Sequence, residues 1–499
     1  MKTQQWILAI DMGTSATKGV LFDLQGKVKS VARKSYPMLS PQIGWSEQEP
    51  ELVFEAVLEV LRETYASKPA EVEIPGIAFS SQMYSILAID REGKPLSNSL
   101  TWADRRSAEI ASAFRQHPDA RELYQRTGCP LDAIYPFSKI KWLQAQANND
   151  QIARFISIKE YVLHNLLGEY VVDWSTASAT GMFDIRQHIW NPLALELLDI
   201  SEQQLSAVVP PGQILSDWKP DILTYTQIPA GTPCIIGGGD GPMASLGVGA
   251  VQSDILAVNV GTSAAARSIL PAPVIDSHGN LWTYALDGDS WVIGGITSSG
   301  GILYDWFTTT FATGVSHVDI NNQVATIAPG AEGLTFIPYL GGEQCPVWNP
   351  NTRGSFLGMT FTHTYAHFIR AVLEGITRSI YRMTKSIELT IQQPFQEIRV
   401  TGGLTSSSTW LQIAADMFGC RVVIPDTPEG SARGAAFMAL KVLGMTTAKT
   451  LISENQAAQT RIEPNVQVHQ FYMEQDEQFD QSLAATKSLD YTECKVKFP

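Results

Sequence analysis

The stretches ILAIDMGTSA (Ile7–Ala16) and ILAVNVGTSA (Ile255–Ala264) decide the fold of this chain. They agree at nearly every position, although about 250 residues separate them. Each reads as a β-strand that ends in a Gly-Thr-Ser turn. Two unrelated strand–turn units can share turn residues, but a match of this length favours a duplicated architecture. Its two halves would meet across a cleft, and such clefts are favoured ligand sites.

Outside the repeat, strand-like and helix-like segments alternate, which predicts an α/β protein. The predicted strands are Ile7–Ile10, Gly19–Phe22, Ile74–Phe79, Ile86–Ile89 and Cys234–Ile236. The predicted helices are Glu49–Tyr65, Ala153–Leu167, Met243–Val248, His367–Met383 and Trp410–Phe418. The spacing of Ser46 and Glu49 is that of a capping box before the first helix. From about Ala448 onward the chain turns polar, which predicts a peripheral helical tail that acts as a cover or as a dimer contact.

Length and charge narrow the class of protein. A chain of 499 residues suggests two or three domains. The net charge of −14 argues against a general nucleic-acid binder, although a local pocket can still be positive. No apolar run approaches the roughly 20 residues of a membrane span, and the N-terminus reads as a strand instead of a signal peptide. The five cysteines are far apart, without a CxxC pair, which indicates a cytoplasmic protein without a zinc site.

The two Gly-Thr-Ser turns suit an anion, and a polyphosphate in particular. Glycine lets the backbone approach a ligand, and the N–H groups and hydroxyls that follow then point at it. Lys18 follows the first turn and places a cation near a phosphate. Asp11 precedes that turn, where a carboxylate makes sense as a direct or water-mediated ligand of Mg²⁺. The second repeat has Asn259 and Ala266 at these two positions, so we expect only the first loop to carry metal and cation chemistry.

The segment GGGDGPMASLGVG (Gly237–Gly249) is the next constellation. Its three glycines free the backbone after a buried strand, and Asp240 stands at the start of the predicted helix. An ionised carboxylate beside a phosphate site suits a base that takes a proton from an attacking hydroxyl. An aspartate here is also a common N-cap. The two phosphate loops favour the base. A further Gly/Ser turn, TGGLTSSS (Thr401–Ser408), suits the base and ribose of a nucleotide, although a plain strand–turn–helix connection looks the same.

With these residues the sequence resembles the FGGY carbohydrate kinases, a family of the actin-like ATPase superfamily. PFSKIKWL (Pro136–Leu143) resembles the first family signature. GSFLGM (Gly354–Met359), followed by HFIRAVLE (His367–Glu374), resembles the second. The resemblance covers about residues 7–445. It implies two ribonuclease-H-like domains around a central cleft, with ATP and Mg²⁺ between them, and transfer of the γ-phosphoryl group to a hydroxyl of a sugar or polyol.

The resemblance also implies roles for individual residues. Asp240 falls on the catalytic base, and Asp11 and Asp240 on the metal side. The implied ATP contacts are Thr14, Ser15, Lys18, Thr262, Gly301, Asp305, Gly403 and Ser407. The implied sugar contacts are Gln82, Met83, Tyr84, Trp102, Asp104 and Arg105. The implied domains are 1–250, mainly sugar-binding, and 251–447, mainly nucleotide-binding, with a peripheral tail at 448–499.

Within the family the sequence looks most like gluconate kinases, and then xylulose kinases. The stretches behind this ranking are LTWAD (Leu100–Asp104), YVVDWSTAS (Tyr170–Ser178) and PVWNP (Pro346–Pro350). Three positions depart from those relatives: Tyr84 replaces a usual His, Gln344 a usual Arg and Arg105 a usual Asn. All three lie at or near the expected sugar side, so the exact sugar stays open.

Side chains on the sugar side allow more than one role. The planar fork of Arg105 suits the carboxylate of gluconate, although an Arg-Arg pair at a helix start is usually solvated. Trp102 either stacks on a sugar face or fills the core. Asp104 and Tyr84 offer hydrogen-bonding groups to sugar hydroxyls.

The sequence therefore predicts an ATP-dependent sugar or sugar-acid kinase. A ketose kinase and a catalytically idle sugar or nucleotide sensor are the alternatives. A phosphatase or general ATPase of the superfamily fits the two signatures less well. The expected partners are a small sugar or sugar acid and ATP/ADP, with no nucleic acid and no membrane. A homodimer is the expected assembly.

Overall fold

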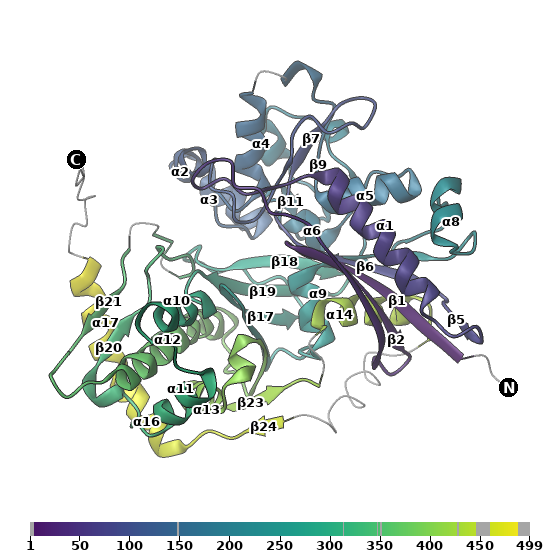
Figure 1. The fold of residues 1–499 in the computed structure, drawn as a ribbon. Helices are drawn as coiled ribbons and strands as arrows, with labels where there is room; N and C mark the ends of the chain where they lie inside the picture. The colour runs from purple at the N-terminus through teal and green to yellow at the C-terminus, as the bar shows by residue number, and fades with distance from the viewer. Residues whose placement is uncertain are drawn as a thin grey trace.

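Each of the two matching stretches forms the central hairpin of its own sheet (Figure 1). This arrangement is that of a computed structural model, which describes residues 4–146, 149–312, 314–346, 348–349, 352–426, 429–445 and 460–487. In the first sheet the order is β14-β15-β6-β1-β2-β3, with β5 beside β1. The bounds are β1 Gln4–Met12, β2 Ala16–Asp23, β3 Val28–Ser35, β5 Val72–Glu73, β6 Ile77–Ser81, β14 Ile214–Leu215 and β15 Cys234–Gly239.

The second sheet repeats this plan, with the order β18-β19-β17-β16-β22-β23-β24. Its strands are β16 Ile255–Val260, β17 Ala264–Leu270, β18 Trp282–Asp287, β19 Ser290–Thr297, β22 Glu397–Gly402, β23 Arg421–Ile424 and β24 Thr460–Ile462. In both sheets an antiparallel hairpin leads on one side to two parallel strands, β6 and β15 in the first and β22 and β23 in the second. The duplicated α/β architecture predicted from the sequence is confirmed.

Helices make up most of the rest of both halves. Those of the N-terminal half are α1 Pro50–Ala66, α2 Ala108–Arg115, α3 Ala120–Thr127, α4 Pro136–Gln144, α5 Ile158–Leu167, α6 Trp174–Ser178, α7 Pro192–Leu198, α8 Pro220–Thr226 and α9 Asp240–Gly247. Those of the C-terminal half are α10 Gly301–Phe311, α11 His317–Ala325, α12 Tyr365–Ile391, α13 Ser408–Phe418, α14 Gly430–Val442, α16 Val466–Glu474 and α17 Asp476–Lys487. Helices α1 and α14 pack on the first sheet, and α12 packs on the second.

Short two-stranded pairs complete the fold. They are β4 Glu47–Gln48 with β8 Ser99–Leu100, β7 Leu87–Ile89 with β9 Arg154–Ile156, β10 Val171–Asp173 with β13 Ala207–Val209, β11 Phe183–Asp184 with β12 Ile189–Trp190, and β20 Thr335–Ile337 with β21 Ser355–Leu357.

The two halves share a core where α9 and α14 cross (Figure 1). Apolar side chains of β1 and β2 pack there against α14 and β18. The backbones meet without side chains between them. A Cβ atom on Gly434 would lie 1.8 Å from the carbonyl oxygen of Met243, and one on Gly247 would lie 1.9 Å from that of Gly430. Only glycine allows this crossing, which fixes the end of β15 relative to the C-terminal half.

Two helix starts differ from the sequence prediction. The helix predicted at Glu49–Tyr65 is confirmed as α1, but it has no capping box. Ser46 is buried instead, and its hydroxyl accepts a 2.8 Å hydrogen bond from Thr101. The segment Ala153–Leu167 is only partly helical. It begins as β9, and Ser157 and Glu160 then form a capping box that starts α5.

The described part of the C-terminal tail is not purely helical. Strand β24 joins the second sheet beside β23, and α16 and α17 lie against the C-terminal half. Tyr472 is 1% exposed and donates a 2.8 Å hydrogen bond to Glu374. Arg378 and Arg382 form ion pairs with Asp476 and Asp480. The tail therefore covers α12 of its own chain. Within the described ranges, no helix combines the length and the apolar character needed to cross a bilayer.

We expect Gly434→Ala to destabilise the protein. Alanine usually stabilises a helix interior, but here its Cβ atom would collide with the carbonyl of Met243, so overpacking dominates at about 1–3 kcal/mol. Thermal and urea unfolding measure the change. Gly288→Ala is the matched control, because a Cβ there meets nothing within 4 Å. Equal stability of both variants would show that the crossing is not tightly packed.

Candidate active site

The first Gly-Thr-Ser loop connects β1 to β2 and is stabilised by hydrogen bonds from two side chains outside the loop. The hydroxyl of Tyr36 donates to the carbonyl of Gly13 at 2.6 Å, and the amide of Gln48 donates to the carbonyl of Thr14 at 2.6 Å. Ser15 is exposed at the tip. Both supports bind carbonyl oxygens and so leave the loop a donor-rich surface, as a phosphate site requires.

Two carboxylates, those of Asp11 at the end of β1 and Asp240 at the start of α9, lie close enough to interact electrostatically. Oδ1 of Asp11 is shielded from solvent and lacks a hydrogen-bond partner among the described residues. Burial, together with the charge of Asp240, raises the pKa of Asp11 to about 6. Burial also raises the pKa of Asp240, against the opposing effects of Arg267 and the N–H group of Gly241. Excess negative charge and an unpaired carboxylate oxygen are the features that a divalent cation relieves.

Asp240 is the first residue of α9 and does not cap it. Gly239 occupies the N-cap position, and the carboxylate of Asp240 accepts a 2.7 Å hydrogen bond from the N–H group of Gly241. The capping alternative from the sequence is therefore wrong. The side chain is only partly buried, and its position in the first turn stabilises the ionised form. Such a group can accept a proton from an approaching hydroxyl.

Lys18 is already paired in this structure. Its ammonium group lies 2.8 and 3.1 Å from the two carboxylate oxygens of Glu429, which precedes α14. Lys18 is opposite Asp11 in the β1–β2 ladder, so its charge also lowers the pKa of Asp11. The ion pair ties the first loop to the C-terminal half, and a phosphate would compete with Glu429 for the ammonium group.

Four of the eight residues predicted to contact ATP line one cavity of about 420 Å³, whereas Thr14, Ser15, Lys18 and Thr262 lie outside its lining. Its lining includes Gly261, Gly301, Asp305, Gly403 and Ser407. Close backbone packing shapes it. The N–H group of Gly301 donates to Gly261 at 2.7 Å, and a Cβ atom on Gly300 would lie 2.4 Å from the backbone of Ser263. Ser407 caps α13 and donates to Asn321 at 2.8 Å.

Thr262 is exposed beside that cavity, at the tip of the second loop. Its carbonyl oxygen accepts a hydrogen bond from the N–H group of Ile302 at 3.3 Å, so the loop is fixed to the start of α10. The hydroxyl groups of the two Gly-Thr-Ser loops are thus carried by two different halves of the chain.

On the sugar side, a hydrogen-bond chain connects the predicted residues to the first phosphate loop. Gln82 donates to Gln48 at 2.6 Å, and the indole N–H of Trp102 donates to the hydroxyl of Thr14 at 3.1 Å. Met83 is 4% exposed and packs against Gly239, next to Asp240. Trp102 therefore does more than fill the core, because its hydrogen bond to the phosphate loop fixes the orientation of the indole ring.

Tyr84 belongs to a cluster of three tyrosines from both halves. Its hydroxyl lies 3.1 Å from that of Tyr284, which in turn lies 3.1 Å from that of Tyr135. The backbone of Tyr84 has a left-handed φ of 67°, which is uncommon outside glycine and asparagine. Burial raises the pKa of all three hydroxyls well above their usual range, so the cluster stays neutral.

Asp104 and Arg105 differ from their predicted roles. Asp104 is 0% exposed, and its oxygens accept hydrogen bonds from Arg106 and from the N–H group of Ser46. It has no surface for a sugar and instead fixes the Trp102 segment. Arg105 donates to Asp132 at 3.0 Å, with 37% of its side chain exposed.

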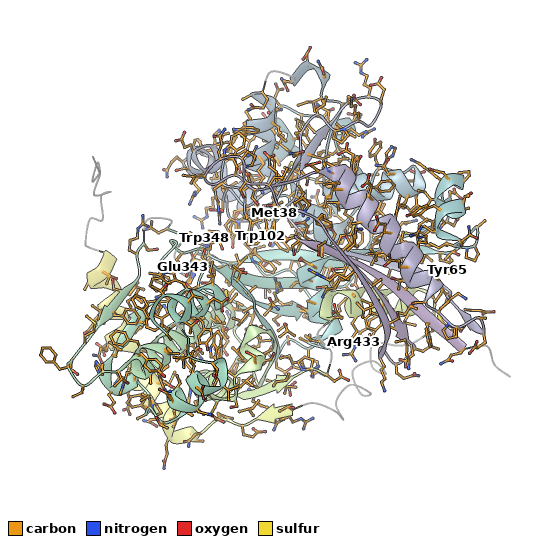
Figure 2. The ribbon with its side chains drawn as sticks, viewed as in Figure 1. Met38, Tyr65, Trp102, Glu343, Trp348 and Arg433 are labelled. Atoms are coloured by element: carbon orange, nitrogen blue, oxygen red, sulfur yellow. The ribbon has the colours of Figure 1, made fainter. Side chains whose placement is uncertain are left out.

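Arg105 and Asp132 line a cavity of about 500 Å³ that both halves form. Glu343 and Trp348 line its C-terminal side, and Figure 2 labels both of them near Trp102 in that view. Gln344, one of the departures from the relatives, also lines it, and its side-chain nitrogen is buried without a partner among the described residues. Of the stretch Pro346–Pro350, Val347 and Pro350 lie outside the described residues.

Sequence reasoning missed Lys139, although it stands inside the first signature. Its ammonium group is fully buried and donates to the carbonyls of Tyr84, Thr101 and Ile134 at 3.1, 2.7 and 2.8 Å. Burial lowers its pKa to about 7. Lys139 thus ties together the two sugar-side segments and the loop before α4. The sequence feature that could have revealed Lys139 is a lysine within a mostly apolar stretch of the first signature.

The two ribonuclease-H-like halves, with glycine loops and acidic residues between them, define a phosphotransferase of the actin-like ATPase class. Comparison with protein families makes this specific. The chain belongs to the FGGY family of carbohydrate kinases, whose N-terminal domain matches residues 6–247 and whose C-terminal domain matches residues 256–443. Enzymes of this family use ATP with Mg²⁺, and the fold and the family predicted from the sequence are both confirmed.

Individual relatives resemble almost the whole chain. The gluconokinase of Bacillus subtilis (strain 168) is 37% identical over 461 residues, which is 90% of each chain. Two solved structures from Lactobacillus acidophilus, a gluconate kinase and a ligand-bound xylulose kinase, each match with a TM-score of 0.92 and 31% identity. Each match covers 97% of this chain and 99% of the other.

The first prediction from the site concerns Asp11. Its carboxyl has a higher pKa in the folded protein than in the unfolded chain, where about 3.9 is usual, so its ionisation lowers stability as the pH rises from about 4 to about 6. Asp11→Asn should therefore stabilise the ligand-free protein at pH 7 by on the order of 1 kcal/mol. The same variant should lose Mg²⁺-dependent activity. Thermal unfolding against pH and Mg²⁺ titration of activity measure the two effects.

The exposed Asp217 provides the control for Asp11. Asp217→Asn should change neither the pH dependence of unfolding nor the Mg²⁺ requirement. A difference in stability between Asp11→Asn and wild type that does not change between pH 4 and 7 would contradict the raised pKa of Asp11.

The second prediction concerns Lys139. Lys139→Met leaves three carbonyls without their donor, and each unsatisfied group costs about 1–3 kcal/mol. The unfolded chain binds a proton at this lysine between about pH 7 and 10.4 that the folded protein does not, so wild-type stability rises with pH in that window. The variant should lose this slope and gain a higher KM for the sugar. Lys141→Met, on the same helix, is the control and should keep both properties.

Proposed function

We propose that this protein phosphorylates gluconate, or a sugar acid of closely similar structure, with ATP as the phosphoryl donor. The observation that carries the proposal is the position of Asp240. Its carboxylate lies at the start of α9, beside Asp11, and directly behind it the sugar-side residue Met83 packs on Gly239. A proton acceptor between a phosphate site and a sugar site is what a sugar kinase needs. The identity to gluconokinases supports the choice of acid.

In the proposed mechanism, Asp240 accepts the proton of the sugar hydroxyl as that hydroxyl attacks the γ-phosphoryl group of ATP. The positive charge of Arg267 and the N–H group of Gly241 hold Asp240 ionised against the effect of burial. Thr14, Ser15 and Thr262 donate hydrogen bonds to the phosphates from the two loops. Gly301, Asp305, Gly403 and Ser407 surround the nucleoside in the cavity that they line.

Asp11 and Asp240 are the proposed protein ligands of Mg²⁺, directly or through water. The unpaired Oδ1 of Asp11 and its raised pKa fit a divalent cation. Among the described residues, no group of three acidic, histidine or cysteine side chains is placed to hold a metal alone. This fits Mg²⁺, which is commonly held by one or two carboxylates together with substrate phosphates and water. When bound, Mg²⁺ supplies positive charge that neutralises the phosphates.

A ketose such as xylulose is the second candidate substrate. The neutral hydroxyls of Tyr84, Tyr135 and Tyr284 favour it, because a ketose needs hydrogen-bonding groups without a charge. The ligand-bound xylulose kinase matches as well in fold as the gluconate kinase does. Gluconate carries a carboxylate, whereas xylulose is a shorter, neutral chain with a ketone, so a cation at the sugar side would favour gluconate.

The proposed reaction belongs in the cytoplasm, where ATP is available. The net charge of −14 provides no electrostatic basis for binding nucleic acid. A homodimer stays a prediction of the sequence, to be measured by sedimentation.

Asp240→Asn should lower kcat for gluconate by at least about 10²–10⁴-fold, because the variant has no proton acceptor. ATP binding should persist, since the ATP cavity does not include residue 240. Coupled ADP release and ATP titration measure the two properties. Asp221→Asn is the control, because Asp221 is also in the first turn of a helix but lies on the surface. Activity of Asp240→Asn within a few-fold of wild type would overturn the assignment of the base.

A further inference from the structure

Arg267 on β17 is, with Lys139, a cation of the site that sequence reasoning passed over. Its guanidinium lies flat against the backbone of Gly241, the residue after Asp240. A Cβ atom on Gly241 would fall 2.7 Å from Nε and 3.0 Å from Cζ and Nη2 of Arg267. On another side the guanidinium lies 6.0 Å from the ring centre of Trp282. These neighbours place it at the sugar side of the base.

No hydrogen bond or ion pair within the described part of the chain involves the side chain of Arg267, and its Nε is completely shielded from solvent. The residue as a whole is only partly buried, and its charge lowers the pKa of the neighbouring Asp240. An arginine stays charged at any physiological pH, so shielding part of its guanidinium without a hydrogen-bond partner is costly. Arginines whose side chains are deeply buried avoid that cost. Arg106, Arg399 and Arg433 each lie within 3.1 Å of a carboxylate oxygen.

The charge of Arg267 affects two groups of the proposed site, the base Asp240 and the sugar-side residue Tyr84. It lowers the pKa of Asp240 and that of Tyr84, against the effect of burial in each case. Trp282, beneath the guanidinium, stacks on Tyr284 at 4.2 Å, and Tyr284 contacts the hydroxyl of Tyr84. Arg267 does not line the ATP cavity. Arg267 also does not line the cavity of Arg105, so its place is given by its neighbours: Gly241 after the base on one side and Trp282, which stacks on the tyrosine cluster, on the other.

We propose that Arg267 binds the carboxylate of the sugar-acid substrate and so determines specificity for an acid over a ketose. The inference rests on the proposed function and names its specificity residue. A planar guanidinium with free N–H groups matches a carboxylate in a bidentate geometry. Arg105, the arginine expected from the sequence, is a weaker candidate. Its guanidinium already binds Asp132, and its side chain is 37% exposed.

The test compares D-gluconate with D-gluconamide, which has the same carbon chain and no negative charge. Wild-type enzyme should prefer gluconate in kcat/KM, and Arg267→Met should lower kcat/KM for gluconate by about 10²-fold or more. Because the charge of Arg267 also lowers the pKa of Asp240, the variant should lower kcat/KM for gluconamide as well, but by clearly less than for gluconate, and it should change the KM for ATP by less than about three-fold. Arg267→Gln keeps two N–H donors without the charge and should show the same selective loss, which covers the case in which Arg267→Met does not fold.

The other outcomes separate the possible failures. Equal losses for gluconate and gluconamide, with the acidic limb of the pH–rate profile moved to higher pH, would mean that Arg267 acts only through Asp240, and the proposal would fall. A gluconate-specific loss in Arg105→Met with none in Arg267→Met would overturn it in favour of Arg105. Wild-type enzyme that phosphorylates D-xylulose but not gluconate would reject the proposed function itself, and the inference with it. The exposed Arg126→Met is the control for loss of an arginine.

Discussion

The crossing of α9 and α14 is the constraint on which the site depends. Met243 and Gly434 meet backbone to backbone there, so the two halves approach more closely than side chains would allow. Asp240 begins α9, and its carbonyl accepts a hydrogen bond from Ser431 in α14. Glu429, just before α14, holds Lys18. One contact between two helices thus sets the distance between the proposed base, the first phosphate loop and the C-terminal half that carries the ATP cavity.

The site contains charged side chains whose polar atoms lack a partner within the described part of the protein. A carboxylate oxygen of Asp11 and the Nε of Arg267 are both shielded from solvent without a hydrogen-bond partner among the described residues. In the proposed mechanism Asp11 binds the metal, Arg267 binds the sugar acid, and Asp240 acts between them. Elsewhere, buried ions such as Lys159 and Asp173 are paired within 2.7 Å. Unpaired buried charge lowers stability, and it persists where binding of a cation or an anion compensates for it. The surplus negative and positive charges match a metal–nucleotide complex and an anionic sugar respectively.

The sequence predicted well what depends on local patterns, and less well what depends on contacts across the fold. The repeat at Ile7 and Ile255 revealed the duplicated sheets because strand and turn are short-range features. The capping-box spacing at Ser157 forms the box that starts α5, whereas at Ser46 the same spacing forms none, because Ser46 is buried and accepts a hydrogen bond from Thr101. The carboxylate of Asp104 could accept hydrogen bonds from a sugar, but in the fold it accepts them from Arg106. Arg267 was missed because it aligns with Gly19, one position beyond the counterpart of Lys18.

The same long-range contacts explain how one scaffold can serve related sugars. Tyr84 adopts a left-handed backbone conformation that an ordinary loop would not retain. Its carbonyl is held by Lys139, which also holds Thr101 and is itself fixed by burial in α4. The backbone of the sugar side is therefore determined by a signature residue that does not face the substrate. Side chains at position 84 and on β17 can then change without moving this backbone. Substrate specificity can therefore vary while the catalytic geometry stays the same.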